Sequence, residues 1–106
     1  MSNILLIEDE DSIRRVLKKV LQEDNQSYKF NEATDGQEGI STIKKQEFDL
    51  ILCDIKMPKK DGIEVLDFIR NHTPTTPVVM ISGHGNLETA VKAMRMGAFD
   101  YISKPP

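Results

Sequence analysis

The sequence contains a series of short apolar runs, and each run stops at a polar or charged residue. The run 50–53 is apolar almost throughout, as expected of a strand that is buried on both faces, and it stops at Asp54. Three other runs also end at polar residues. The run 4–7 is followed by Glu8 and Asp9, the run 78–81 by Ser82, and the run 98–102 by Ser103 and Lys104. Such runs predict strands that end at a polar edge.

Segments with helical periodicity separate these runs. We expect a first helix to begin near Asp9 or Asp11, as its N-cap, and to end at about Asp24. Its apolar residues recur at helical spacing and should face the core, whereas the basic residues between them should face water. The apolar set is Ile13, Val16, Leu17, Val20 and Leu21, and the basic set is Arg14, Arg15, Lys18 and Lys19.

Three more helices are predicted along the chain. The second follows Asp35-Gly36, the third follows Gly62, and the fourth turns an apolar stripe toward the core, formed by Leu87, Ala90, Val91 and Met94. Gly97 can supply the left-handed C-cap of the fourth helix, and an edge strand is expected over 28–33. The alternation of strands and helices in one 106-residue domain predicts an α/β fold with a parallel sheet and right-handed crossovers.

Composition argues against several classes of function. The net charge is −3, with 17 acidic and 14 basic residues, whereas a domain that contacts nucleic acid normally carries a basic face. The single cysteine, Cys53, excludes an internal disulfide and fits a reducing cytoplasm. No apolar run approaches the roughly 20 residues that a membrane-spanning helix needs. We therefore expect a cytoplasmic domain that contacts neither nucleic acid nor membrane.

The strand ends bring acidic residues to one edge of the predicted sheet, where open parallel α/β sheets bind their ligands. Glu8, Asp9 and Asp54 would repel one another there by roughly 4 kcal/mol per pair at about 4 Å and an effective dielectric near 20. A cation must offset this repulsion, and Mg²⁺ commonly binds through one or two carboxylates, water and a phosphate oxygen. The competing interpretation of Asp9 is a simple helix cap.

The same residues suit phosphoryl chemistry. A carboxylate can attack phosphorus and form an acyl phosphate, while the protein positions the group and neutralises its oxygens. Asp54 would supply the attacking oxygen, Lys104 would bind one phosphoryl oxygen as a point charge, and the Ser82 hydroxyl would donate to another. Taken singly, Ser82 and Lys104 are also ordinary turn residues.

Together these residues resemble the receiver domain of bacterial two-component response regulators, and the resemblance covers the whole chain. The region of Tyr101 and the segment 82–86 are most similar to receivers of nitrogen-regulation-type transcriptional activators. The resemblance implies a flavodoxin-like, doubly wound, five-stranded parallel sheet of order 2-1-3-4-5. The matching motifs are Glu8-Asp9, Asp54 with Met57-Pro58 and Asp61-Gly62, Ser82-Gly83, and the segment from Gly97 to Pro105.

The resemblance also implies a role for each motif. Asp54 would accept a phosphoryl group from a sensor histidine kinase in a Mg²⁺-dependent reaction, and the domain would act as a switch for an output such as transcription rather than as an enzyme. Ser82 and Tyr101 would form the switch pair, and Lys104 would be the lysine of the family's site, followed by a cis peptide to Pro105. The implied Mg²⁺ ligands are Glu8, Asp9, the Asp54 carboxylate and the backbone carbonyl of Lys56.

Two features depart from the family pattern. The first metal acid is Glu8 where many relatives have Asp, and its longer side chain changes its reach. Receivers normally carry a fifth helix after the lysine, whereas this sequence stops at Pro106. We therefore expect residues 1–106 to form a C-terminally incomplete receiver domain with an uncovered apolar face. Such a face could bind a second copy of the domain, as in a homodimer. The sequence assigns no role to His84, two residues after Ser82.

Two other classes of function compete with this interpretation. A Mg²⁺-dependent phosphohydrolase with an aspartyl-phosphate intermediate is the main alternative, but the haloacid dehalogenase type needs an Asp two positions after the nucleophile, where this chain has Lys56. A flavin-binding flavodoxin-like module would need a phosphate-binding loop rich in Ser and Thr after the first strand. Glu8, Asp9 and Glu10 would repel a phosphate at that place.

Overall fold

Strands and helices alternate along the whole of the described chain. The computed structural model describes residues 2–83 and 87–104, and this part contains five strands and four helices. The strands are β1 (Asn3–Ile7), β2 (Lys29–Ala33), β3 (Leu50–Asp54), β4 (Val78–Ser82) and β5 (Asp100–Ser103). The helices are α1 (Asp11–Asp24), α2 (Gly36–Lys45), α3 (Gly62–His72) and α4 (Leu87–Arg95).

The five strands form one parallel sheet in the order β2-β1-β3-β4-β5, which confirms the predicted flavodoxin-like fold. The register aligns Ile7 with Cys53, Asp54 with Ile81, and Ser82 with Ser103. Because all strands run in the same direction, the polar residues that follow them meet at one edge. The sequence prediction of a polar edge at the carboxyl ends of the strands is therefore confirmed.

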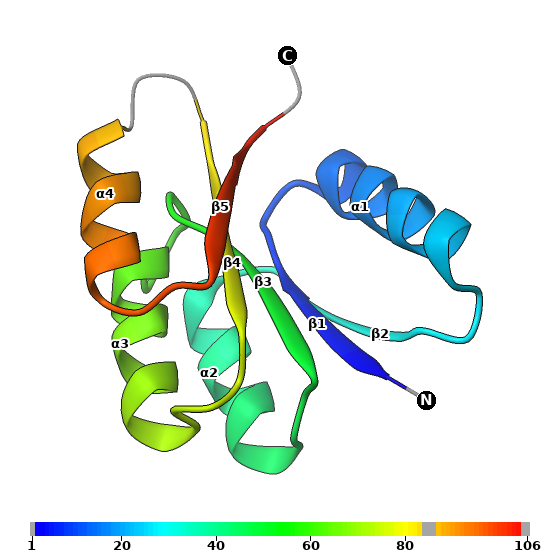
Figure 1. Cartoon of the computed structure of the whole chain (residues 1–106), viewed down its shortest axis with the longest axis horizontal. Coiled ribbons are helices and arrows are strands. Elements are labelled where there is room, and N and C mark those ends of the chain that lie inside the picture. Colours follow the sequence, from blue (N-terminus) through cyan, green and yellow to red (C-terminus); the bar gives the residue numbers. More distant parts are fainter. Residues whose placement is uncertain (1, 84–86, 105–106) are drawn as a thin grey trace.

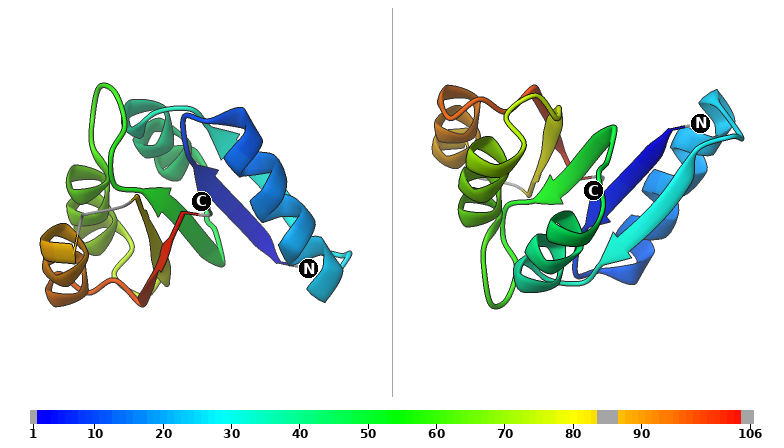
Figure 2. Two further views of the ribbon diagram at one scale, coloured as in Figure 1. Left: turned by 90° about the horizontal axis from the view of Figure 1, so that it is seen from above. Right: turned by 90° about the horizontal axis from the view of Figure 1, so that it is seen from below.

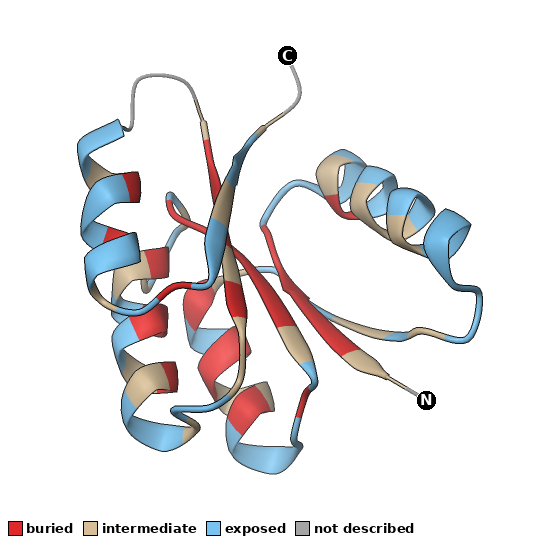
Figure 3. Cartoon of the chain, in the orientation of Figure 1, coloured by how far each residue is buried: buried red, intermediate tan, exposed pale blue. Residues whose placement is uncertain are grey.

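The sheet separates two layers of helices (Figures 1 and 2). Helices α2, α3 and α4 cover one face, and α1 lies on the other. Alternate residues of each strand serve the two layers: Leu5 and Ile7 of β1 join the larger core with α2, α3 and α4, whereas Ile4 and Leu6 join a smaller core on the side of α1. The central strands are accordingly buried on both faces, and α1 remains largely accessible (Figure 3).

Helix α1 differs from its sequence prediction in two respects. Its N-cap is Glu10 rather than Asp9 or Asp11, and the Glu10 side chain makes no capping hydrogen bond. The predicted faces are also only partly correct: Arg14 is buried, whereas Val16 and Val20 are 46% and 58% exposed. The reason is that the guanidinium of Arg14 finds acceptors on neighbouring elements, which lets a charged side chain enter the interior.

Helix α4 presents a different face to the core than its apolar stripe predicts. Leu87, Val91 and Met94 are exposed, and the buried residues of the helix are Ala90 and Ala93. Small side chains allow the helix to approach the sheet closely, so the larger apolar residues are left on the outside. The prediction that Leu87, Val91 and Met94 face the core is therefore wrong.

Two glycines shape the connections that support the polar edge. Gly62 donates its N–H to the carbonyl of Ile55 at 2.7 Å, and a Cβ at this position would lie 2.1 Å from the Asp54 carbonyl oxygen. The loop between β3 and α3 can return close to β3 only because residue 62 has no side chain. Gly97, just after α4, has φ of +104°, the positive value expected from its predicted role at the helix end.

The described helices include none that combines the length and the apolar character needed to cross a membrane. Two sequence expectations, the cis peptide between Lys104 and Pro105 and the role of His84, fall outside the described residues.

Candidate functional site

Asp54 is the last residue of β3, and its carboxylate lies at the buried centre of the polar edge. The residue is only 1% exposed. The following N–H, that of Ile55, donates to the carbonyl of Ile81 at 3.0 Å, so β3 stays paired with β4 past Asp54. This pairing holds the aspartate on a rigid strand end rather than on a loop. The backbone that carries the Asp54 carboxylate is therefore held in place.

Lys104 reaches Asp54 from the end of β5. Its backbone N–H donates to the carbonyl of Ser82 at 2.7 Å, which continues the β4–β5 pairing. Its Nζ lies 3.0 Å from Oδ2 of Asp54, 3.3 Å from Oε1 of Glu8 and 3.1 Å from Oε1 of Glu10. One ammonium group therefore faces three carboxylates that belong to two different segments of the chain.

Glu8 follows β1 directly and is completely buried. Its N–H donates to the carbonyl of Ala33 at 3.0 Å, and its Oε2 accepts the N–H of Glu10 at 3.1 Å. Burial is the main reason that the pKa of Glu8 rises to about 7, with the contact to Asp9 and the charge of Asp54 adding to the effect. The glutamate thus reaches the buried site despite the difference from the family's usual aspartate.

The charges of the site are incompletely compensated. Burial alone would lower the pKa of Lys104, but its contacts with Asp54 and Glu10, together with the charge of Glu8, outweigh burial and raise that pKa. Among the described residues, Oε1 of Glu8 and Oδ2 of Asp54 are buried without a hydrogen-bond partner, although both lie within ion-pairing distance of Lys104. Buried carboxylate oxygens of this kind are suited to a further cation.

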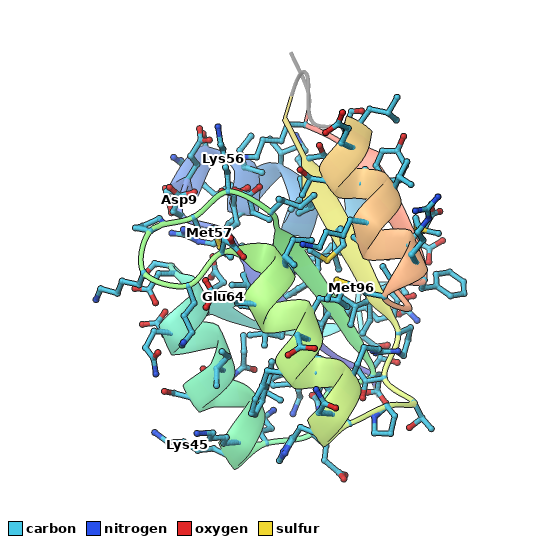
Figure 4. All side chains as sticks on the ribbon, turned by 90° about the vertical axis from the view of Figure 1, so that its left-hand side faces the viewer. Asp9, Lys45, Lys56, Met57, Glu64 and Met96 are labelled. Atoms are coloured by element: carbon cyan, nitrogen blue, oxygen red, sulfur yellow. The ribbon has the colours of Figure 1, made fainter. Side chains whose placement is uncertain are left out.

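Three consecutive acids form a second part of the site. Carboxylate oxygens of Glu8, Asp9 and Glu10 lie within 4.8 Å of one another, a spacing at which they could hold one metal ion. Asp9 and Glu10 are exposed, and Lys56 is exposed on the loop after β3. Asp9 and Lys56 lie at the same end of the molecule, opposite Lys45 (Figure 4). Glu10 has no role in the site predicted from the sequence, and the signal for it is its position directly after Glu8 and Asp9.

Ser82 and Tyr101 lie on neighbouring strands beside the acidic centre. Ser82 is buried at the end of β4, and its Oγ donates to the carbonyl of Gly83 at 3.1 Å. Tyr101 pairs with Met80 on β4, two residues before Ser82, and its side chain packs half-buried against the larger core. At about 3.3 Å per residue the two positions are offset by roughly 7 Å along the sheet. The two residues of the predicted switch pair therefore lie on adjacent strands, and their role as a switch stays a prediction.

This arrangement combines the groups that phosphoryl chemistry requires. A carboxylate on a rigid strand end faces a lysine, a serine hydroxyl lies on the adjacent strand, and acidic residues that could bind a metal lie on the other side. The structure brings together Asp54, Glu8 and Lys104 directly, with Asp9 next to Glu8. It places Lys56 and Ser82 on the flanking segments.

Comparison with known proteins identifies the family. Residues 4–106 match the model of the response regulator receiver domain. The nitrogen assimilation regulatory protein NtrX of Azorhizobium caulinodans is 40% identical over 105 residues, which are 97% of this chain and 23% of NtrX. A crystal structure of NtrX from Brucella abortus in complex with ADP superposes with a TM-score of 0.89 at 38% identity, over 99% of this chain and 24% of that one.

A second solved structure, the Mn²⁺-bound form of the response regulator Rcp1, covers 99% of this chain and 82% of its own with a TM-score of 0.88 at 26% identity. The curated relatives are longer proteins: this chain spans 22–43% of their length. The family match, the sheet order and the arrangement of Asp54, Glu8 and Lys104 agree with one another. The chain is a receiver domain and belongs to the response regulator family.

Proposed function

We propose that this domain is a phosphorylation-controlled switch in which Asp54 is the phosphoacceptor and a sensor histidine kinase is the donor. The observation that carries the proposal is the contact between the buried Asp54 carboxylate and the Lys104 ammonium at 3.0 Å. Lysine at this distance can bind an oxygen of the incoming phosphoryl group as a point charge. The proposed output is transcription, because the similar ZraR of Klebsiella oxytoca and SrrA of Staphylococcus aureus are transcriptional regulatory proteins.

In the proposed reaction an oxygen of Asp54 attacks phosphorus and forms an acyl phosphate. The bond between phosphorus and the imidazole nitrogen of the kinase histidine breaks, and its electron pair returns to that nitrogen. Lys104 neutralises one phosphoryl oxygen, and the Ser82 hydroxyl turns from the Gly83 carbonyl to donate to another. The paired strand end would hold the backbone of Asp54 in place during the attack.

The residues of the acidic edge fit Mg²⁺. Oxygen is the ligand that this ion prefers, and the site offers buried carboxylate oxygens that lack hydrogen bonds among the described residues. Asp9, Asp54, Glu8 and the carbonyl of Lys56 are the proposed ligands. The bound ion would neutralise charge on the phosphoryl oxygens. The Mn²⁺-bound form of the related Rcp1 is in line with a divalent ion in this family.

Phosphorylation would act as a switch by changing the hydrogen bonding of Ser82. The loss of the Ser82–Gly83 contact would alter the start of the segment that leads to α4, and Tyr101 on β5 would respond to the change. We further propose that the domain is a switch rather than an enzyme, acts in the cytoplasm and contacts no nucleic acid or membrane itself. Its possible partners include a second copy of the same domain.

The phosphoacceptor is tested with acetyl phosphate and Mg²⁺, followed by intact-protein mass spectrometry. The parent domain should gain one phosphoryl group and release acetate, whereas Asp54→Asn should gain none. Asp67→Asn is the matched control, because Asp67 is exposed on α3 and should leave labelling unchanged. Equal labelling of Asp54→Asn and the parent would refute the assignment, and rapid continuous turnover of acetyl phosphate would favour the phosphohydrolase alternative.

The metal site is tested by titrating Mg²⁺ into the Asp9→Asn, Asp54→Asn and Glu8→Gln variants. We expect larger losses of affinity for the two aspartate variants than for Glu8→Gln, since the shorter aspartate side chains are more rigid. Calorimetry or NMR titration gives the dissociation constants directly. An Asp9→Asn variant that binds Mg²⁺ as tightly as the parent would show that the ion sits elsewhere.

A further inference from the structure

Arg14 on α1 is a buried cation that lies behind the acidic edge. Its Nη1 donates to the backbone carbonyl of Glu8 at 2.7 Å, its Nε donates to Oε1 of Glu32 at 2.9 Å, and its Nη2 donates to Oδ1 of Asp11 at 3.0 Å. The residue is 9% exposed. A guanidinium group that is buried with three aligned acceptors is a fixed element of the structure, unlike a solvated surface charge.

The three acceptors belong to three different segments. Glu8 starts the loop after β1, Glu32 lies on the edge strand β2, and Asp11 is in the first turn of α1. Lys18 also donates to Glu32, at 3.0 Å to its other oxygen, so the glutamate is held from two positions of the helix. Arg14 thereby ties the beginning of α1 to the end of β1 and to the neighbouring strand β2.

The contact with the Glu8 carbonyl restrains the peptide unit that leads into Asp9. A peptide unit is planar, so the carbonyl oxygen of Glu8 and the Cα of Asp9 lie in one rigid plane. The hydrogen bond from Arg14 holds this plane at the Glu8 carbonyl. The next peptide unit is held by a second hydrogen bond, in which the Oε2 of Glu8 accepts the N–H of Glu10. The N-cap Glu10 provides no side-chain capping bond that could hold the loop instead.

We propose that Arg14 is a positioning residue for the divalent-cation site: it orients the loop 8–10 so that the carboxylates of Glu8 and Asp9 lie together at the polar edge. This inference rests on the proposed magnesium site. Arg14 would not contact the ion itself, because its guanidinium donates to the backbone carbonyl of Glu8 rather than to the carboxylate of that residue. Lys104 contacts the carboxylate of Glu8, whereas Arg14 contacts the backbone carbonyl of the same residue.

Electrostatics and positioning predict opposite results when Arg14 is replaced. A cation near a metal site repels the metal, so removal of its charge alone should tighten Mg²⁺ binding. If Arg14 positions the loop, its loss should weaken binding, because groups that orient metal ligands typically contribute about 10- to 100-fold to metal affinity. The sign of the change therefore separates the two roles.

The experiment measures Mg²⁺ affinity in Arg14→Gln, Arg14→Lys and Arg15→Gln by NMR titration of backbone amides, which reports on folded molecules. Arg15→Gln is the matched control: it removes the same charge from the next residue, whose exposed side chain pairs with Asp11 and, within the described part of the chain, donates to none of the loop's carbonyl groups. We expect about tenfold or greater weakening in Arg14→Gln and parent-like or slightly tighter binding in Arg15→Gln.

Arg14→Lys keeps the positive charge and the aliphatic part of the side chain, but a lysine ammonium cannot reach all three acceptors as the planar guanidinium does. This variant should therefore also weaken Mg²⁺ binding. Should Arg14→Gln not fold, Arg14→Lys decides the question alone. Parent-like or tighter Mg²⁺ binding in a folded Arg14 variant would overturn the inference while leaving the magnesium site intact. A parent domain that binds no Mg²⁺ would instead refute the proposed site itself.

Discussion

Lys104 at the end of β5 places its Nζ 3.0 Å from Oδ2 of Asp54 at the end of β3, although β4 lies between the two strands. The contact is possible because the carboxyl ends of parallel strands meet at one edge and the lysine side chain is long enough to cross the intervening strand. It stabilises a buried carboxylate that would otherwise carry its charge without compensation. The resting site is therefore held together by the residues that would bind the phosphoryl group.

Replacement of Lys104 by Met should destabilise the metal-free domain. Asp54 and Glu8 would lose their nearest cation, and the free energy of unfolding should fall by about 2–3 kcal/mol. Saturating Mg²⁺ should restore part of the loss, since the ion supplies positive charge to the same acids. Urea denaturation in EDTA and in Mg²⁺ measures both effects. Lys92→Met, at an exposed position of α4, is the control, and equal stabilities of the two variants would contradict the prediction.

The stability of the metal-free domain should depend on pH through Glu8. The pKa of this residue is about 7 in the folded domain, against an ordinary value of 4.5, so the folded state binds the proton more tightly than the unfolded state. This contribution is fully present below the ordinary pKa and is lost as pH rises through about 7. Between about pH 5.5 and pH 8 the loss should be about 2 kcal/mol.

The glutamine variant isolates this contribution. Glu8→Gln cannot titrate, so its free energy of unfolding, measured by urea denaturation in EDTA, should change less over the same pH interval than that of the parent. Other titrating groups are common to both proteins and cancel in the comparison. Parallel pH profiles for the parent and the variant would show that Glu8 keeps an ordinary pKa in the fold.

Gly62→Ala should disturb both stability and phosphorylation. The added Cβ would lie 2.1 Å from the Asp54 carbonyl oxygen and 2.7 Å from the Cα of Ile55, so the backbone beneath the acceptor has to shift. We expect a loss of about 3 kcal/mol in unfolding free energy, together with slower labelling by acetyl phosphate. Gly83→Ala is the control, because a Cβ there meets nothing within 4 Å. A Gly62→Ala variant as stable as Gly83→Ala would contradict the close approach of this loop to β3.

Ser82→Ala should separate phosphorylation from switching. Asp54 and Lys104 remain, so the variant should still take up a phosphoryl group, but it lacks the hydroxyl that is proposed to link that group to Tyr101. NMR of the phosphorylated variant should show parent-like changes near Asp54 and reduced changes at Tyr101 and along α4. A full parent-like response at Tyr101 would remove Ser82 from the proposed link.

The sequence alone determined the α/β class and the polar edge. Apolar runs that stop at Glu8, Asp54 and Ser82 specify strand ends, and parallel strands bring their ends together whatever the details of side-chain packing. The second helix, predicted to follow the turn at Asp35-Gly36, and the left-handed residue Gly97 depend on equally local rules, and the structure has a helix that begins at Gly36 and a positive φ at Gly97. Local pattern suffices here because strand ends and helix ends are marked by nearby residues, and the alternation of strands and helices makes the strands parallel.

Only the tertiary structure decided which residues of the helices are buried. Periodicity placed Arg14 in water and Met94 in the core, whereas Arg14 is buried and Met94 is exposed. The guanidinium enters the interior because acceptors from β2 and the loop after β1 surround it, and α4 approaches the sheet through Ala90 and Ala93. Partners that come from distant segments leave no periodic signal along the chain, so the energy of burial depends on neighbours that only the folded molecule supplies.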